Sequence, residues 1–152
     1  MRGGRAPKHG GQGAQALGRS RGGFSTKLHV LVDALGNPLK FSLTSGAAGD
    51  NPRAIPLLAG QQAEEVVADR GYDADKTLAY IERDSGAVAT IPPRKSRVAP
   101  RDCDYAADKE RHLVECFIGK LKYFRRVFAR YDKYAKRFLA FVHFASMVIW
   151  LR

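Results

Sequence analysis

The order of short apolar segments along this chain is the feature that most restricts its fold. Residues 26–32 and 39–44 have strand-like alternation and flank a turn at 33–38, which predicts a hairpin. Residues 65–69 and 87–91 are apolar runs typical of buried strands, and helical segments precede and follow each of them. The order is therefore strand, strand, helix, strand, helix, strand, helix, helix, which indicates an α/β fold.

Turn and cap residues mark the ends of the predicted helices. Asp50, followed by Asn51 and Pro52, predicts a helix start, and this helix is expected to stop at Gly60. Asp75 is expected to cap a second helix that ends near Gly86. A final apolar helix is predicted over residues 134–151.

The chain is expected to divide into an arm and a single domain. Residues 1–23 hold eight of the 15 glycines and almost no large apolar side chain, so we expect a flexible basic arm there. Order is expected to begin near Phe24, and residues 24–152 are the predicted domain. A chain of 152 residues that is 45% hydrophobic can build one proper core.

The net charge of +11 is unevenly distributed. Residues 1–32 carry six Lys or Arg and no acid, and residues 109–137 carry ten against three. The stretch 33–108 has nine basic and twelve acidic residues. Basic regions at both ends indicate a polyanionic partner, most simply nucleic acid. A solvated basic surface and a structural RNA-binding protein are the alternatives.

Other compositional signals point to an intracellular chain without a membrane segment. Cys103 and Cys116 form neither a disulfide framework nor a zinc-binding pattern. The first residues lack the apolar run of a signal peptide. The apolar tail at 138–151 is short for a membrane span and suits a buried helix.

Three charged residues on the helix that follows the basic loop share one face. At 100° per residue, Arg111, Glu115 and Lys122 fall within about 40° of one another. A carboxylate between two cations can hold a metal ion beside a phosphodiester. The alternative is an ordinary surface helix with i,i+4 and i,i+7 charge neighbours.

Asp69 is the second candidate, because ligands of open α/β sheets bind at the carboxyl ends of strands. The alternative is a turn carboxylate that accepts from the backbone of Gly71 or Tyr72. Asp69 and Glu115 together can converge on Mg²⁺, which prefers oxygen ligands and keeps several waters. The sequence offers no convincing third carboxylate for a two-metal site, since the others suit turn and cap roles: Asp33, Asp50, Asp73 and Asp75.

Aromatic and basic residues interleave from residue 123 to residue 138. Such a pattern can stack bases, although we expect most of these rings in the core. His29 and His143 are expected to be satisfied core histidines, because one lies in a strand and the other in an apolar helix.

Several segments together resemble the carboxy-terminal part of bacterial insertion-sequence transposases of the DDE class, in the fifth insertion-sequence group. The resemblance implies an RNase H-like core, with a mixed sheet and flanking helices. It covers nearly the whole chain from about Ala14. The segments that carry it are 14–27 (AQALGRSRGGFSTK), 32–38 (VDALGNP), 67–73 (VADRGYD), 91–94 (IPPR), 109–115 (KERHLVE) and 144–152 (FASMVIWLR).

The resemblance implies a role for each matched residue. Asp69 corresponds to the second catalytic Asp and Glu115 to the catalytic Glu, and both would ligate Mg²⁺ or Mn²⁺. The family signature of Tyr, Arg, Glu and Lys is matched at Arg111, Glu115 and Lys122, whereas its tyrosine position is Asp108. Further DNA contacts are implied at Lys27, Arg125 and Arg126.

The resemblance also implies what precedes this segment in the family. The first catalytic Asp lies on the first sheet strand, upstream of the part that matches, so we expect the first strand to be lacking. The implied function is DNA transposition, with metal-dependent cleavage and joining of transposon ends and target DNA once an upstream-frame polypeptide or self-association completes the site. The alternative is a catalytically inactive DNA-binding remnant or a regulator. A bacterial, nucleoid-associated cytoplasmic location is expected.

Overall fold

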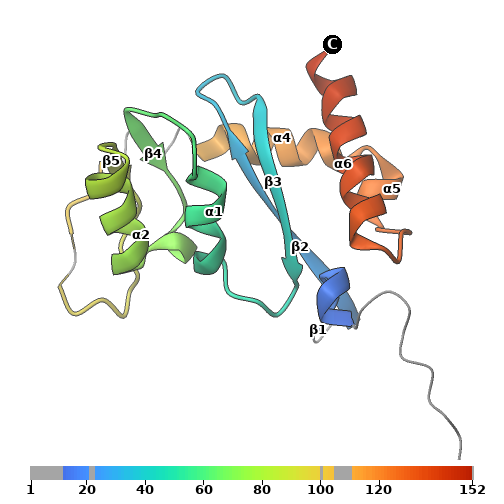
Figure 1. Cartoon of the computed structure of the whole chain (residues 1–152), viewed down its shortest axis with the longest axis horizontal. Coiled ribbons are helices and arrows are strands. Elements are labelled where there is room, and N and C mark those ends of the chain that lie inside the picture. The colour runs from blue at the N-terminus through green and yellow to red at the C-terminus, as the bar shows by residue number, and fades with distance from the viewer. Residues whose placement is uncertain (1–11, 21–22, 100, 105–110, 152) are drawn as a thin grey trace, which may run out of the picture. The chain divides into compact units, whose positions relative to one another are not determined.

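The computed structural model describes residues 12–20, 23–99, 101–104 and 111–151. These residues form a mixed α/β chain, which confirms the predicted class (Figure 1). Among them the strands make a three-stranded sheet in the order β1-β2-β3 and a two-stranded sheet of β4 and β5. Asp108, which occupies the tyrosine position of the family signature, lies outside the described residues.

The elements follow the predicted order closely. The strands are β1 (Gly18–Ser20), β2 (Gly23–Val32), β3 (Pro38–Ser45), β4 (Glu65–Val67) and β5 (Val88–Thr90). The α-helices are α1 (Ala54–Leu58), α2 (Asp75–Ala79), α4 (His112–Lys122), α5 (Arg125–Phe128) and α6 (Ala135–Trp150). Short 3-10 turns are η1 (Gln12–Gln15), η2 (Asn51–Arg53) and η3 (Arg70–Tyr72), and α2 continues as a π-helical turn, η4 (Tyr80–Asp84).

The chain divides into two compact units, and β2, β3 and α4 each pass from one to the other. The first unit comprises residues 1–29, 43–48 and 120–152. The second comprises residues 30–42 and 49–119, so it holds both candidate carboxylates, Asp69 and Glu115.

The core of the second unit lies beneath the strand end that carries Asp69. Its buried residues come from α2, η4 and the β5 region: Leu78, Ile81, Ala87 and Ile91. The side chains of Val66 and Ala68 pack against this cluster. β4 pairs with β5 in parallel, with Val66 opposite Ala89, and Ala68 N donates to Thr90 O at 3.2 Å. The pairing and the core therefore fix the point at which the chain leaves β4.

The turn of the predicted hairpin is built around Asp33. Its Oδ1 accepts from Leu35 N at 2.9 Å and from Asn37 N at 2.8 Å. Burial would raise the pKa of Asp33, but hydrogen bonds from Asn37, Leu35 and Gly36 outweigh it and lower the pKa. The prediction of Asp33 as a turn residue is confirmed.

Helix α4 packs on this hairpin through its apolar side. Phe117 is 2% exposed, and its ring centroid lies 6.0 Å from that of Phe41. Leu113 Cβ lies 3.6 Å from the point where a side chain on Gly36 would begin, so the turn and the helix are in contact. This packing leaves the opposite side of α4, including Glu115, exposed.

In the first unit, regular structure is already present before Phe24. The expectation placed its start near Phe24, whereas η1 and β1 already lie within residues 12–20. Contacts with distant residues explain the difference: Arg130 Nη1 donates to Ala16 O at 3.0 Å, and Ala135 N donates to Gln15 Oε1 at 2.9 Å. Long-range hydrogen bonds thus order a segment whose composition lacks apolar surface.

The C-terminal helix α6 confirms the prediction for residues 134–151. Phe138, Val142 and Ala145 form its buried side. None of the described helices combines the length and the apolar character that a membrane crossing requires.

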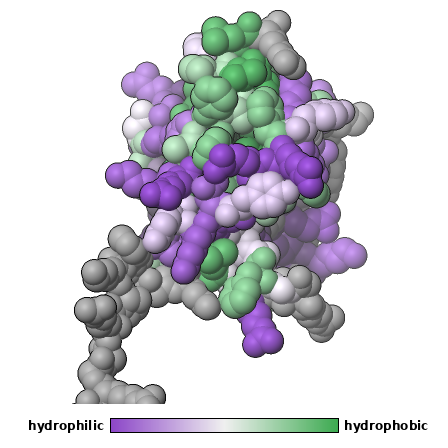
Figure 2. Space-filling view, turned by 90° about the vertical axis from the view of Figure 1, so that its right-hand side faces the viewer, coloured by the Kyte–Doolittle hydropathy of each residue, from purple (hydrophilic) through white to green (hydrophobic). Residues whose placement is uncertain are grey.

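Several side chains of the first unit are more exposed than predicted. Of the interleaved rings, Tyr123, Phe128 and Tyr131 are exposed, whereas Phe138 is buried. Figure 2 shows hydrophobic side chains gathered at the top of one face, above a band of hydrophilic ones. His143 is also exposed, while His29 is buried and bonded to Thr44 Oγ1 at 2.7 Å, as expected of a core histidine. Phe124 has an extended backbone conformation and separates α4 from α5. Phe128 therefore does not continue the apolar side of α4.

Candidate active site

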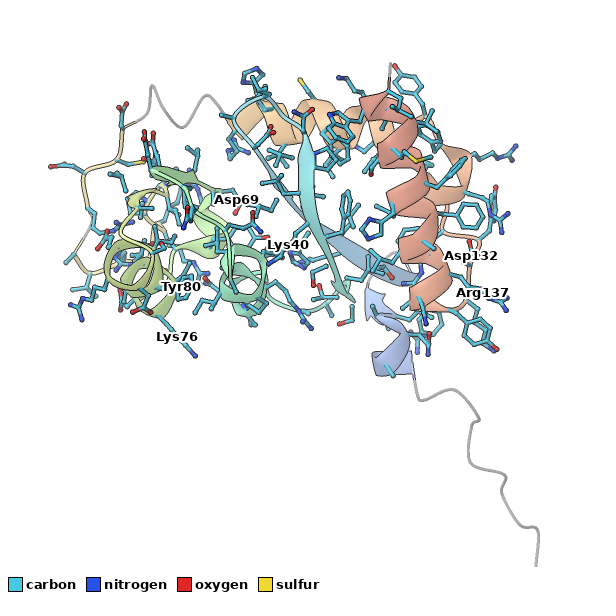
Figure 3. All side chains as sticks on the ribbon, turned by 45° about the horizontal axis from the view of Figure 1, so that its top comes forward. Lys40, Asp69, Lys76, Tyr80, Asp132 and Arg137 are labelled. Carbon is cyan, nitrogen blue, oxygen red and sulfur yellow. The ribbon has the colours of Figure 1, made fainter. Side chains whose placement is uncertain are left out.

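Asp69 lies two residues after the end of β4 and is the N-cap residue of the turn η3 (Figure 3). Its Oδ1 accepts from Gly71 N at 2.7 Å. This is the turn geometry that the structural interpretation of Asp69 predicts. The residue is nevertheless exposed, so its carboxylate is also accessible to a ligand from solvent.

Asp50 lies beside Asp69, a proximity that the sequence did not predict. Asp50 occupies the predicted N-cap position, with Pro52 in the first turn, but its side chain makes no cap hydrogen bond to η2. Instead, a Cβ added to Gly71 would lie 3.1 Å from Asp50 Oδ2 and 2.7 Å from Asp69 Oδ1. Two carboxylates therefore close on the same glycine, and a larger residue at this position would require them to move.

The negative charges of Asp50 and Asp69 affect the pKa of Tyr72. Burial raises the pKa of its hydroxyl to about 12, and the charges of Asp50 and Asp69 add to the increase. The phenol is therefore protonated at neutral pH. A neutral hydroxyl can donate a hydrogen bond without adding to the charge of the two carboxylates.

Asp73 and Asp75 have roles different from those predicted. Asp73 is buried, and its carboxylate accepts from Arg94 N at 2.8 Å and from Arg97 Nη1 at 2.7 Å. Arg97 also pairs with Asp75, and the hydrogen bond to Asp73 is the main reason that the pKa of Arg97 is raised. Helix α2 is preceded by Ala74 at its cap position, so Asp75 is not the cap. The two aspartates hold the basic loop 94–101 against the turn that follows Asp69.

Glu115 lies on α4 and pairs with Arg111. Arg111 Nη1 lies 2.7 Å from Glu115 Oε1, and the two side chains are 36% and 64% exposed. An exposed i,i+4 pair contributes under about 1 kcal/mol, so little free energy opposes exchange of Arg111 for another cation. The ordinary surface pairing is thus present, and it leaves the Glu115 carboxylate accessible.

The remaining predicted DNA-binding residues belong to the first unit, and three of them have protein partners. Lys27 Nζ donates to Ala48 O at 2.8 Å. Arg125 Nε donates to Tyr131 Oη at 3.0 Å, and the Arg126 guanidinium lies 3.9 Å from the centroid of the Phe141 ring. Lys122 is exposed at the end of α4. These partners orient the cationic groups without removing Arg125 or Arg126 from solvent.

The donor chemistry at Gly71 suits a hard divalent cation. Carboxylate oxygens are the ligands that Mg²⁺ prefers, and few are needed because the ion keeps several waters. Because Gly71 has no side chain, the carboxylate oxygens of Asp50 and Asp69 can approach it closely. Among the described residues, however, no group of three or more His, Cys, Asp or Glu side chains could hold a metal ion. The described part of the chain thus offers a partial ligand set.

These features define a basic α/β protein with exposed carboxylates after a strand and on a helix. Residues 66–152 match the family model of the transposase DDE domain. The chain therefore belongs to the DDE transposase family, and this family identity supports a role in DNA transposition. Members of the family generally use divalent metals, and transposases act on DNA.

Two relatives of the chain are named for insertion-sequence elements. One, from Brucella ovis, is described by its expected role as the transposase for element IS6501. It is 43% identical to this chain over 130 residues, which cover 85% of this chain and 100% of the relative. The other, from Burkholderia cepacia, is described in the same way for IS402; it is 28% identical over 149 residues, which cover 90% of this chain and 67% of the relative. No solved structure matches the chain.

Proposed function

We propose that this chain carries part of the active site of an insertion-sequence transposase that cleaves and joins DNA strands at transposon ends. The family match at residues 66–152 carries the proposal, because it spans both Asp69 and Glu115. The exposure of both carboxylates supports it, since a residue that acts on DNA must be reachable from solvent. The first catalytic Asp, supplied by an upstream segment or polypeptide, would complete the site.

Each residue has a distinct role in this proposal. Asp69 and Glu115 would hold Mg²⁺ or Mn²⁺. When bound, the metal would polarise the phosphodiester and lower the pKa of the attacking water. The Gly71 N–H holds one oxygen of Asp69 in place, and Tyr72 lies near Asp50 and Asp69 as a neutral donor. Arg111 would exchange its pairing with Glu115 for a DNA phosphate when the carboxylate takes up the metal.

The basic residues would hold the DNA. Lys122, Arg125 and Arg126 are exposed cations that suit phosphate contacts, and Lys27 is a further candidate. The exposed rings of Tyr123, Phe128 and Tyr131 lie among them in the sequence and can stack on unpaired bases at a transposon end.

A non-catalytic DNA-binding protein, either a remnant or a regulator of transposition, is the second candidate. It is favoured by the absence of a three-carboxylate group among the described residues. The two functions differ in one respect: both predict salt-sensitive DNA binding, but only the first predicts cleavage.

Metal removal separates these functions. The chain, supplied with a segment that carries the first catalytic Asp, is incubated with a labelled duplex that ends in the transposon sequence. We expect strand cleavage in Mg²⁺ and none in EDTA, with DNA binding retained in both. Binding without cleavage in Mg²⁺ and in Mn²⁺ would identify the non-catalytic function.

Gly71→Ala should impair cleavage without unfolding the protein. The new Cβ would lie 2.7 Å from Asp69 Oδ1 and 3.1 Å from Asp50 Oδ2, so both carboxylates must move. A displacement of this size is expected to lower the cleavage rate about 100-fold. Gly119→Ala is the matched control, because a Cβ at that helical position meets nothing within 4 Å. Cleavage by Gly71→Ala equal to that of the control would show that the position of these carboxylates is unimportant.

A further inference from the structure

Two of the segments that carry the family resemblance meet at Arg94. Its side chain is exposed and makes two hydrogen bonds to the turn that follows Asp69. Arg94 Nε donates to Arg70 O at 3.1 Å, and Nη2 donates to Gly71 O at 2.7 Å. Its backbone N–H donates to the buried carboxylate of Asp73. The segments 91–94 and 67–73 are thus joined by three hydrogen bonds, two of which come from one guanidinium.

The hydrogen bond from Arg94 Nε to Arg70 O is linked to Asp69 through a single peptide group. The carbonyl of Arg70 and the N–H of Gly71 belong to the same planar amide. Its oxygen accepts from Arg94 Nε, and its N–H donates to Asp69 Oδ1. Fixing the carbonyl therefore fixes the direction of the N–H. A cationic donor on the oxygen also polarises the amide and strengthens the N–H as a donor.

We propose that Arg94 is a positioning residue, which orients the carboxylate of Asp69 through the Arg70–Gly71 peptide. This inference rests on the proposed function, in which Asp69 is a metal ligand. Hydrogen-bond partners behind a metal ligand fix its orientation, and their loss typically lowers metal affinity 10- to 100-fold. Arg94 is exposed, so we expect the lower end of that range.

The side-chain type supports this assignment. Guanidinium has several donors in a rigid fork, which allows one side chain to bond two successive carbonyls. Lysine has a point-like ammonium on a flexible stem and reproduces that arrangement only in part. Lys95, the next residue, is also exposed and basic, and it provides the matched control.

A direct phosphate contact is the competing role for an exposed arginine in this family. The two roles predict different effects of Arg94→Gln. Loss of a phosphate contact weakens DNA binding and reduces its salt dependence by about one counterion. Loss of the positioning contact leaves DNA binding unchanged and alters the Gly71 amide and the metal affinity.

The test uses the full chain labelled with ¹⁵N, compared as wild type, Arg94→Gln, Arg94→Lys and Lys95→Gln. In Arg94→Gln we expect the Gly71 amide proton to move upfield and to exchange with solvent about ten-fold faster. Half-maximal broadening of the signals around Gly71 should need about ten-fold more Mn²⁺. Lys95→Gln should match wild type, and Arg94→Lys should fall between wild type and Arg94→Gln.

Each contrary result has a defined meaning. An unchanged Gly71 amide in Arg94→Gln overturns the positioning role, as does a shifted amide with unchanged Mn²⁺ broadening. If Arg94→Gln does not fold, Arg94→Lys decides by the same two measurements. Failure of the proposed function is seen separately: Asp69→Asn would then bind Mn²⁺ as wild type does, whatever the Gly71 amide shows.

Discussion

Asp69→Asn should lower the rate of strand cleavage by the completed transposase about 1,000-fold, with DNA binding within about two-fold of wild type. Asparagine keeps an oxygen that can accept from the Gly71 N–H, so the turn is retained while the negative charge is lost. Glu115→Gln should have the same effect, because its amide oxygen can still accept from Arg111. Single-turnover cleavage and gel-shift binding, measured on the same preparations, separate chemistry from DNA binding.

Asp50→Asn is the informative comparison, since Asp50 and Asp69 both close on Gly71. We expect a smaller loss of about ten-fold, because Asp50 lies outside the matched residues 66–152. A larger loss in Asp50→Asn than in Asp69→Asn would exchange the roles of the two carboxylates. Undiminished cleavage in Asp69→Asn or in Glu115→Gln would exclude that residue as a metal ligand.

Asp73→Ala should lower the free energy of unfolding by about 3 kcal/mol, the largest stability effect that we expect from a polar substitution here. Asp73 is 3% exposed, and its carboxylate bonds both the Arg94 backbone and the Arg97 guanidinium. Removing it leaves the partly buried Arg94 N–H without its acceptor and takes away the buried partner of the Arg97 guanidinium. Urea unfolding monitored by circular dichroism measures the change.

Asp75→Ala controls for the loss of a carboxylate beside the same arginine. The Asp75 side chain is 90% exposed, so its pair with Arg97 should contribute under about 1 kcal/mol. Equal destabilisation by Asp73→Ala and Asp75→Ala would show that burial of Asp73 does not determine its contribution.

Local patterns were sufficient to predict most elements of the fold. The alternation that predicted strands at 26–32 and 39–44 corresponds to β2 and β3, and Asp33 forms the expected turn. The apolar run at 87–91 became β5. Such segments are governed by near neighbours and by a uniform burial pattern, both of which the sequence displays directly.

The surroundings of Asp69 could not be predicted, because they depend on contacts between distant residues. The local pattern Asp50-Asn51-Pro52 is a helix-start signal, and nothing within it indicates a neighbour some twenty residues away. The sequence near Asp73 suggests only a turn role, because the arginine partners of its carboxylate follow more than twenty residues later. The glycine pattern of residues 12–20 likewise gave no sign of Arg130, which lies 114 positions beyond Ala16.

The Asp73 contacts change what the net charge of this protein means for its attraction to DNA. In loop 94–101, Arg97 faces Asp73 and Asp75, and Arg101 lies 3.8 Å from Asp73 and 3.7 Å from Glu82. These cations are already compensated by neighbouring carboxylates, so they add little to the electrostatic potential that a phosphate chain meets. The formal charge of +11 belongs to the whole chain, whereas the second unit has 11 basic and 14 acidic residues, so long-range steering of DNA should depend on the first unit more than on this loop.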